Sequence, residues 1–93
     1  MTPEEELVRA GRARDILSEP LVKEALNTMR EAFISGIRRS AFVDDKLREK
    51  LCHRLAILEE FVSQLETVIE TGKMAEETIR QKTLAERVRE ALS

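Results

Sequence analysis

The sequence is poor in the residues that most binding and catalytic sites use. Its 93 residues include no tryptophan or tyrosine, three phenylalanines, one histidine and one cysteine. So few aromatic rings argue against the stacking platforms that hold single-stranded nucleic acid. The lack of tryptophan and tyrosine also removes two of the residue types that usually anchor a tight protein interface. A single cysteine excludes a disulfide within the chain, which fits a reducing compartment.

Long apolar runs and a dominant charge are also absent. No apolar run approaches the ~20 residues that span a bilayer, and the opening MTPEEELVRAGRARD is acidic where a signal peptide needs a basic and then an apolar segment. With a net charge of −2, the chain as a whole is not expected to bind polyanions such as nucleic acid. We therefore expect a single domain over residues 1–93 that is cytoplasmic, neither membrane-bound nor secreted by a signal peptide.

Two prolines and three glycines punctuate a sequence that is otherwise rich in helix formers. Thr2 is a good cap and Pro3 suits a first helical position, so a helix is expected from Pro3 to about Leu17. The next break is at Ser18-Glu19-Pro20, where Ser18 is the expected cap of a second helix.

The 21–39 segment carries apolar residues at steps of four and three, which predicts one wide apolar helix face. These residues are Val22, Leu26, Met29, Phe33 and Ile37. Residues 40–45 form the expected connection, with Asp44 or Asp45 capping the third helix. Phe42 and Val43 are expected to plug the connection against the helix pair.

The third helix has the strongest pattern, a heptad repeat over about three heptads with an additional apolar column. Because three columns are broader than a simple coiled-coil seam, this face should pack on more than one neighbour, another subunit included. We interpret it as the core or self-association face, made of Leu47, Leu51, Leu55, Leu58, Phe61, Val62, Leu65, Val68 and Ile69.

The heptad pattern stops at Gly72, which sits where a left-handed glycine would end the helix. Residues 73–93 then predict a fourth helix with a sparse apolar pattern, a candidate partner-binding tail. Its large apolar residues are Met74, Ile79, Leu84, Val88 and Leu92. Three interpretations stay open: a solvated, partly docked helix, a third helix that continues through Gly72, or a tail that folds only on a partner.

These patterns predict an all-α fold. We expect a small helical bundle built on an antiparallel hairpin of the second and third helices, with the N- and C-terminal helices at its sides, within or between subunits. Its expected core is Val22, Leu26, Met29, Phe33, Ile37, Leu51, Leu55, Leu58, Val62, Leu65 and Ile69.

Nothing in the sequence indicates catalysis, a cofactor or a metal. Cys52 and His53 are adjacent, so on a helix they point about 100° apart and do not chelate one ion. We expect Cys52 to be a small packing residue and His53 to be exposed near Glu49. The sequence contains no phosphate-binding glycine motif, so we predict that the protein is not an enzyme.

One cluster of bases surrounds the connection between the second and third helices, with seven bases and four acids between Arg30 and Arg54. It is either a solvated end of the bundle or a corner that contacts phosphates with salt-sensitive affinity. The candidate contacts are Arg38, Arg39, Lys46, Arg48, Lys50 and Arg54.

Three stretches together resemble a known group of proteins. They are A-x-x-I-L-x-x-P-L-x-x-E-A-L at residues 13–26, D-x-x-x-R-E-K-L at 44–51 and L-E-x-V-I-E-T-G-K-M-A at 65–75. This order resembles small, uncharacterised, all-helical proteins of tailed bacteriophages and prophages, often encoded near head and packaging genes. Members often carry tryptophan in the second and third helices, where this chain has Gly36 or Ile37 and Cys52.

The resemblance implies a phage protein in the host cytoplasm or the virion. The first hypothesis is a homo-oligomeric module that binds phage structural proteins during virion assembly. The second is a nucleic-acid-binding packaging accessory similar to a small terminase subunit, and the third is a small inhibitor of a host defence enzyme.

Overall fold

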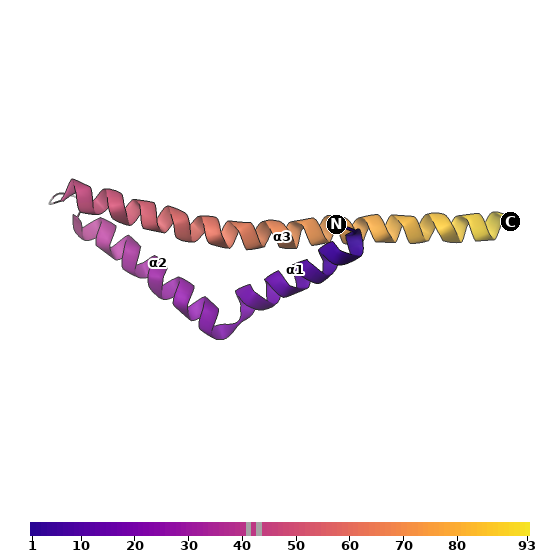
Figure 1. Ribbon diagram of the computed structural model, residues 1–93, viewed down its shortest axis with the longest axis horizontal. Coiled ribbons are helices and arrows are strands. Elements are labelled where there is room, and N and C mark those ends of the chain that lie inside the picture. The colour runs from indigo at the N-terminus through magenta and orange to yellow at the C-terminus, as the bar shows by residue number, and fades with distance from the viewer. Residues whose placement is uncertain (41, 43) are drawn as a thin grey trace. The chain divides into compact units, whose positions relative to one another are not determined.

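The computed structural model describes residues 1–40, 42 and 44–93, and the described residues form three α-helices and no strand. The helices are α1 (Pro3–Ser18), α2 (Pro20–Ser40) and α3 (Asp45–Leu92) (Figure 1). The predicted all-α class is therefore confirmed.

Side-chain caps mark the helix starts. The Thr2 hydroxyl accepts a hydrogen bond from the Glu5 amide at 3.1 Å, and Asp44 accepts one from the Leu47 amide at 3.0 Å. These are the two caps predicted for α1 and α3. The expectation that Ser18 caps α2 is wrong, because the Val22 amide donates instead to the Glu19 carboxylate at 2.9 Å. The positive end of the helix dipole also stabilises a carboxylate at the start of α2.

The predicted helix end at Gly72 is wrong. A single helix of 48 residues runs through this position, and no described glycine has a positive φ. The separate fourth helix expected for residues 73–93 is therefore the continuation of α3 (Figure 1). The alternative of an unbroken third helix, left open by the sequence, is the observed one.

The chain divides into two compact units. Unit 1 comprises Met1–Asp15 and Leu65–Ser93, and unit 2 comprises Ile16–Gln64. In unit 1 the buried residues are all small, namely Ala10, Ala13, Gly72 and Ala75. A Cβ built on Gly72 would overlap the Cβ of Ala10, so the two helix backbones approach closely at this point. Glycine is used here for close approach and not for a turn.

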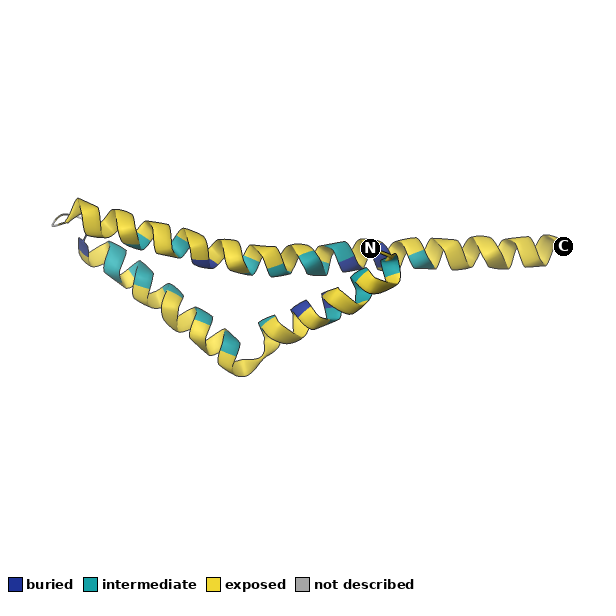
Figure 2. Cartoon of the chain, viewed as in Figure 1, coloured by how far each residue is buried: buried dark blue, intermediate teal, exposed yellow. Residues whose placement is uncertain are grey.

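In unit 2, α2 contacts the first half of α3. The Leu51 side chain covers Gly36, and Leu58 is the buried apolar residue of this unit, at 6% exposure. Most of the other predicted core residues are half-buried, and Met29 is exposed (Figure 2). The predicted plug is wrong for Phe42, whose side chain is fully exposed, while Val43 lies outside the described residues.

Candidate interaction surface

The broad apolar face predicted on the third helix is divided by its neighbours. In unit 2, Leu58 is buried and Leu51, Leu55 and Val62 are half-buried. In unit 1, Leu65, Val68 and Ile69 are half-buried. Two members of the predicted face, Leu47 and Phe61, are exposed. Helices α1 and α2 therefore account for most of this face, each within its own unit.

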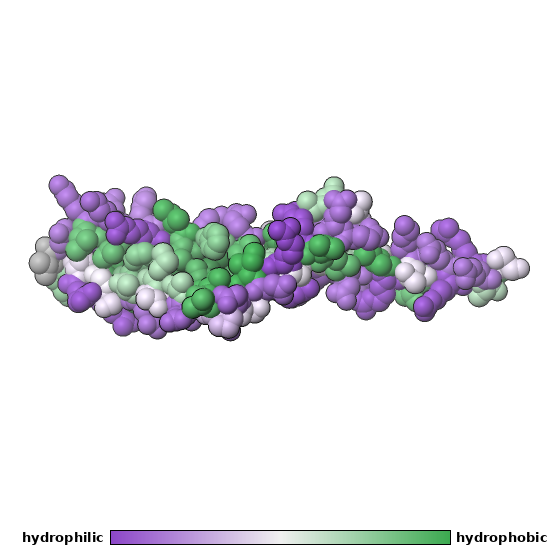
Figure 3. Space-filling view, turned by 60° about the horizontal axis from the view of Figure 1, so that its bottom comes forward, coloured by the Kyte–Doolittle hydropathy of each residue, from purple (hydrophilic) through white to green (hydrophobic). Residues whose placement is uncertain are grey.

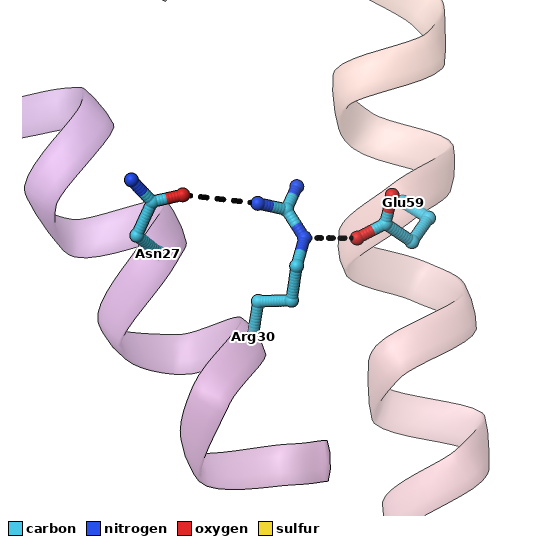
Figure 4. Close-up of polar contacts among 3 residues, drawn as sticks. All are labelled: Asn27, Arg30 and Glu59. Atoms are coloured by element: carbon cyan, nitrogen blue, oxygen red, sulfur yellow. Dashed lines mark hydrogen bonds and ion pairs between the residues drawn. The ribbon is translucent and has the colours of Figure 1, made fainter.

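A polar contact marks one side of unit 2. The Arg30 Nε donates to Glu59 Oε1 at 2.6 Å, and Arg30 Nη1 donates to Asn27 Oδ1 at 3.1 Å (Figure 4). The Arg30 and Glu59 side chains are 32% and 51% exposed, so solvent screens the pair. The Arg30–Glu59 pair therefore serves mainly to identify the side of the α2–α3 contact on which polar residues lie.

The opposite side of unit 2 is apolar and uncovered. Met29 lies about 100° before Arg30 around α2, on the other flank of the half-buried row. Phe61 lies on the corresponding flank of α3, away from Glu59. We call this surface the open side, and its exposed apolar residues are Met29, Leu47, Ile57 and Phe61.

Three residues of the open side, Met29, Ile57 and Phe61, are close in level along the helices. The Gly36–Leu51 and Arg30–Glu59 contacts place Met29 level with the turn that carries Ile57 and Phe61. Apolar side chains gather over α2 and the first half of α3 in the left part of Figure 3. Exposed apolar groups that gather in this way mark interaction sites more often than scattered ones do. The sequence pattern missed Ile57 because it falls outside all three apolar columns of α3.

The predicted basic corner is exposed throughout, at Arg38, Arg39, Lys46, Arg48, Lys50 and Arg54. Lys46, Lys50 and Arg54 follow one another at steps of four and share one face of α3. With Glu49 and His53 they line a shallow surface depression. Anions can reach these three cations, although Glu49 moderates the local positive charge.

The predicted partner-binding tail is divided between two faces. Ile79 is half-buried and lies on the face of α3 that carries Gly72 and Ala75. The other members, Met74, Leu84, Val88 and Leu92, are exposed. From Arg80 to the end of α3, every residue is exposed.

No cluster of metal-ligating side chains is found among the described residues. They include no group of three His, Cys, Asp or Glu side chains arranged to hold a metal ion. His53 is exposed as predicted, but the interpretation of Cys52 as a packing residue is wrong, because its thiol side chain is exposed. Among the described helices, none combines the length and the apolar character needed to cross a membrane.

Comparisons with known proteins found no matching family model, no similar curated protein and no similar solved structure.

Proposed function

We propose that the chain is a non-enzymatic protein that acts by protein–protein interaction and self-associates through the open side of unit 2. The observation that carries this proposal is the exposed apolar group around Met29, Ile57 and Phe61, which are 45%, 67% and 54% exposed. A partner that buries this surface would gain about 25 cal/mol of favourable free energy for each Å² of apolar area removed from water.

The small core of the isolated chain supports self-association. Its buried apolar residues are Ala10, Ala13, Leu58 and Ala75, and no large side chain is fully buried among the described residues.

The proposal takes α2 and the first half of α3 as an antiparallel hairpin whose bundle is completed by a second copy. Two contacts support this arrangement, Gly36 with Leu51 and Arg30 with Glu59. As the residue number falls along α2 it rises along α3, which is the antiparallel order. A two-helix layer buries only one stripe of each helix and needs a further layer on its open side.

The resemblance to phage-encoded proteins suggests the setting, which is virion assembly or a place in the virion itself. In that setting the open side would join copies of the chain, or join the chain to a structural protein of the particle. Mass spectrometry of purified particles from cells that encode the chain tests the setting. Its absence from particles and from their assembly intermediates would contradict this part of the proposal.

Light scattering on a sizing column, at two protein concentrations, tests self-association. We expect an oligomer for the native chain and a smaller native mass for the double variant Ile57→Ser with Phe61→Ser. The matched control is Val8→Ser, which also removes an exposed apolar residue but lies on α1. A native mass of 10.7 kDa at both concentrations would contradict the proposal.

A second candidate function is binding of duplex DNA, and the observation that favours it is the exposed row of Lys46, Lys50 and Arg54. Such binding would weaken steeply with salt, because each phosphate contact releases counterions. Replacing Lys46, Lys50 and Arg54 by alanine should reduce both the affinity and the salt dependence. Replacing Arg9 and Arg12 on α1 is the control, and an equal loss in the control would contradict a site at the corner.

A further inference from the structure

An exposed row runs along α3 within unit 2, beside the face that α2 covers. Its members are all exposed and follow one another at steps of four and three, namely Lys50, Arg54, Ile57, Phe61 and Gln64. Steps of this kind keep side chains in one stripe of a helix. Because Ile57 and Phe61 belong to the open side, the row is part of the surface that the proposed function uses.

One flank of the row carries His53 and Glu60. These residues are seven positions apart, so they lie on the same side of the row, and both are exposed. The Gln64 amide donates to the Glu60 carboxylate at 2.7 Å, which holds the carboxylate toward the row. The row and its flank are therefore basic at one end, around Lys50 and Arg54, and acidic at the other.

A shallow depression lies at the basic end. Its lining residues are Lys46, Glu49, Lys50, His53 and Arg54. Three bases and one acid give this depression a positive charge, which attracts a carboxylate. Glu60 lies only six residues beyond Arg54, so the same stretch of α3 carries both a carboxylate and a place that can receive one.

We infer that this row pairs with the same row of a second copy, in the antiparallel direction, about a two-fold axis at Ile57. The inference rests on the proposed function and deepens it, because it assigns the partner of the open side and the direction of the contact. In such a pair, positions whose numbers add to about 114 lie level with each other. Every contact away from the axis then occurs twice.

The contacts in this register are complementary. Ile57 packs on Ile57 of the second copy, and Lys50 lies level with its Gln64. Arg54 lies level with Glu60 of the second copy and beside its Phe61, whose ring face attracts a guanidinium. The carboxylate of each copy therefore enters the basic depression of the other.

Charge selects both the direction and the register. In a parallel pair in register, Lys50 and Arg54 would each lie beside the same base of the second copy, where like charges repel. An antiparallel pair with its axis at Glu60 would oppose two carboxylates, and an axis at Arg54 would oppose two guanidiniums. The axis at Ile57 separates each of these like pairs by six residues, which is roughly 9 Å along the helix.

Three other charged residues of this part of α3 point away from the row. Glu59 is paired with Arg30 on the polar side of unit 2. Asp45 and Arg48 lie on the far side of α3, because each is about 150° around the helix from the middle of the row. None of the three therefore lies between the paired copies.

The remaining charges lie at the basic end. Lys46 and Arg39 add bases there, since Lys46 lines the depression and Arg39 of α2 lines a second depression with Leu47 of the open side. Glu49 is the acid of this end, and it lies five residues from the level of Glu60 of the second copy, roughly 7.5 Å along the helix. Bases lie between these two acids, so the attraction at this end outweighs their repulsion.

Disulfide trapping tests the position of the axis. In a Cys52→Ala background, which removes the exposed native thiol, we expect Ile57→Cys to form a covalent dimer on mild oxidation. Phe61→Cys is the matched control in the same row, four residues further along. In the antiparallel pair it stays monomeric alone and links only when mixed with Arg54→Cys.

A charge exchange tests the same contact without cysteines. We expect Arg54→Glu and Glu60→Arg each to weaken self-association about tenfold or more, because each opposes like charges across the pair. A chain that carries both changes should recover most of the native association, since the exchanged charges attract again. Glu24→Arg on α2 is the control for an equal change in net charge and should have little effect. Circular dichroism checks that each variant is helical.

The outcomes separate this inference from the proposed function. A native chain that is monomeric at both concentrations contradicts both. An oligomer that shrinks on Ile57→Ser with Phe61→Ser, but gives no Ile57→Cys dimer, equal self-linking of Phe61→Cys or no recovery on charge exchange, keeps the proposed function and overturns the two-fold pair. An Ile57→Cys dimer together with recovery in the exchanged chain supports both.

Discussion

Gly72 of α3 lies against Ala10 of α1, so closely that a Cβ on Gly72 would overlap the Cβ of Ala10. The same Cβ would lie 3.4 Å from the Glu6 carbonyl oxygen and 3.6 Å from the Ala10 Cα, so backbone atoms also line the contact. Ala13 and Ala75 complete a small-residue packing in unit 1. The absence of a side chain at Gly72 is therefore what lets α1 approach α3.

We predict that Gly72→Ala destabilises the chain, although alanine is the better helix former. The substitution gains about 1 kcal/mol in helix propensity. It also forces α1 away from α3, since the obstructing Ala10 Cβ is fixed to the backbone and cannot rotate aside, and such overpacking costs about 1–3 kcal/mol. Urea unfolding followed by circular dichroism measures the net loss in the free energy of unfolding.

Gly11 provides the matched control for this experiment. It lies in α1, beside Ala10, and a Cβ built on it meets nothing within 4 Å. Gly11→Ala should therefore raise the free energy of unfolding by about 1 kcal/mol. If both substitutions stabilise the chain equally, the close contact at Gly72 does not form.

Gly36→Ala should be milder than Gly72→Ala. A Cβ on Gly36 would lie 2.7 Å from the Leu51 Cδ1, which is the end of a flexible side chain. Leu51 can rotate away at a cost of about 0.5–1.5 kcal/mol, close to the gain in helix propensity. We expect a net change within about 0.5 kcal/mol by urea unfolding. A loss as large as that of Gly72→Ala would show that Leu51 cannot move.

The sequence predicted the helical class, the breaks near residues 19 and 42, the cap at Thr2, and a cap at Asp44 or Asp45, of which the structure uses Asp44. These depend on local chemistry, which the sequence carries directly. The end predicted at Gly72 was wrong because glycine has two uses in helices. It can end a helix in the left-handed region, or it can admit a neighbouring backbone, and the choice depended on Ala10, 62 residues away.

The open side could not be predicted for a similar reason. The apolar columns of α3 indicate how much surface needs covering, but not which neighbour covers it. Helix α2 packs against the side of α3 that carries Leu51 and Leu58, and Phe61 stays exposed. Ile57 carried no signal, because a single apolar residue outside a periodic row looks like an ordinary surface residue.

The Arg30–Glu59 pair should contribute little to stability despite its 2.6 Å distance. The two side chains are 32% and 51% exposed, so water and salt screen the attraction, and such pairs typically contribute up to about 1 kcal/mol. A double-mutant cycle with Arg30→Ala and Glu59→Ala should give a coupling below this value that shrinks in 1 M NaCl. A larger coupling that salt does not alter would mean that the pair is shielded from solvent, for instance within an oligomer.

Leu58 and Ile57 are neighbours in sequence with opposite environments, at 6% and 67% exposure. Leu58→Ala removes a buried side chain and should cost about 2–5 kcal/mol, with the lower end expected because a two-helix contact can collapse around the cavity. This loss is a property of the single chain, so it should be the same at every protein concentration. Ile57→Ala should cost less than about 0.5 kcal/mol in dilute protein, as exposed substitutions usually do.

The two variants should diverge from each other as the protein concentration rises. Association adds stability by mass action, so a residue at the interface between copies contributes more when more chain is associated. The difference in melting temperature between the native chain and Ile57→Ala should therefore widen from low to high micromolar protein, while that of Leu58→Ala stays constant. A constant, small effect of Ile57→Ala across a hundredfold range of concentration would place Ile57 outside any interface between copies.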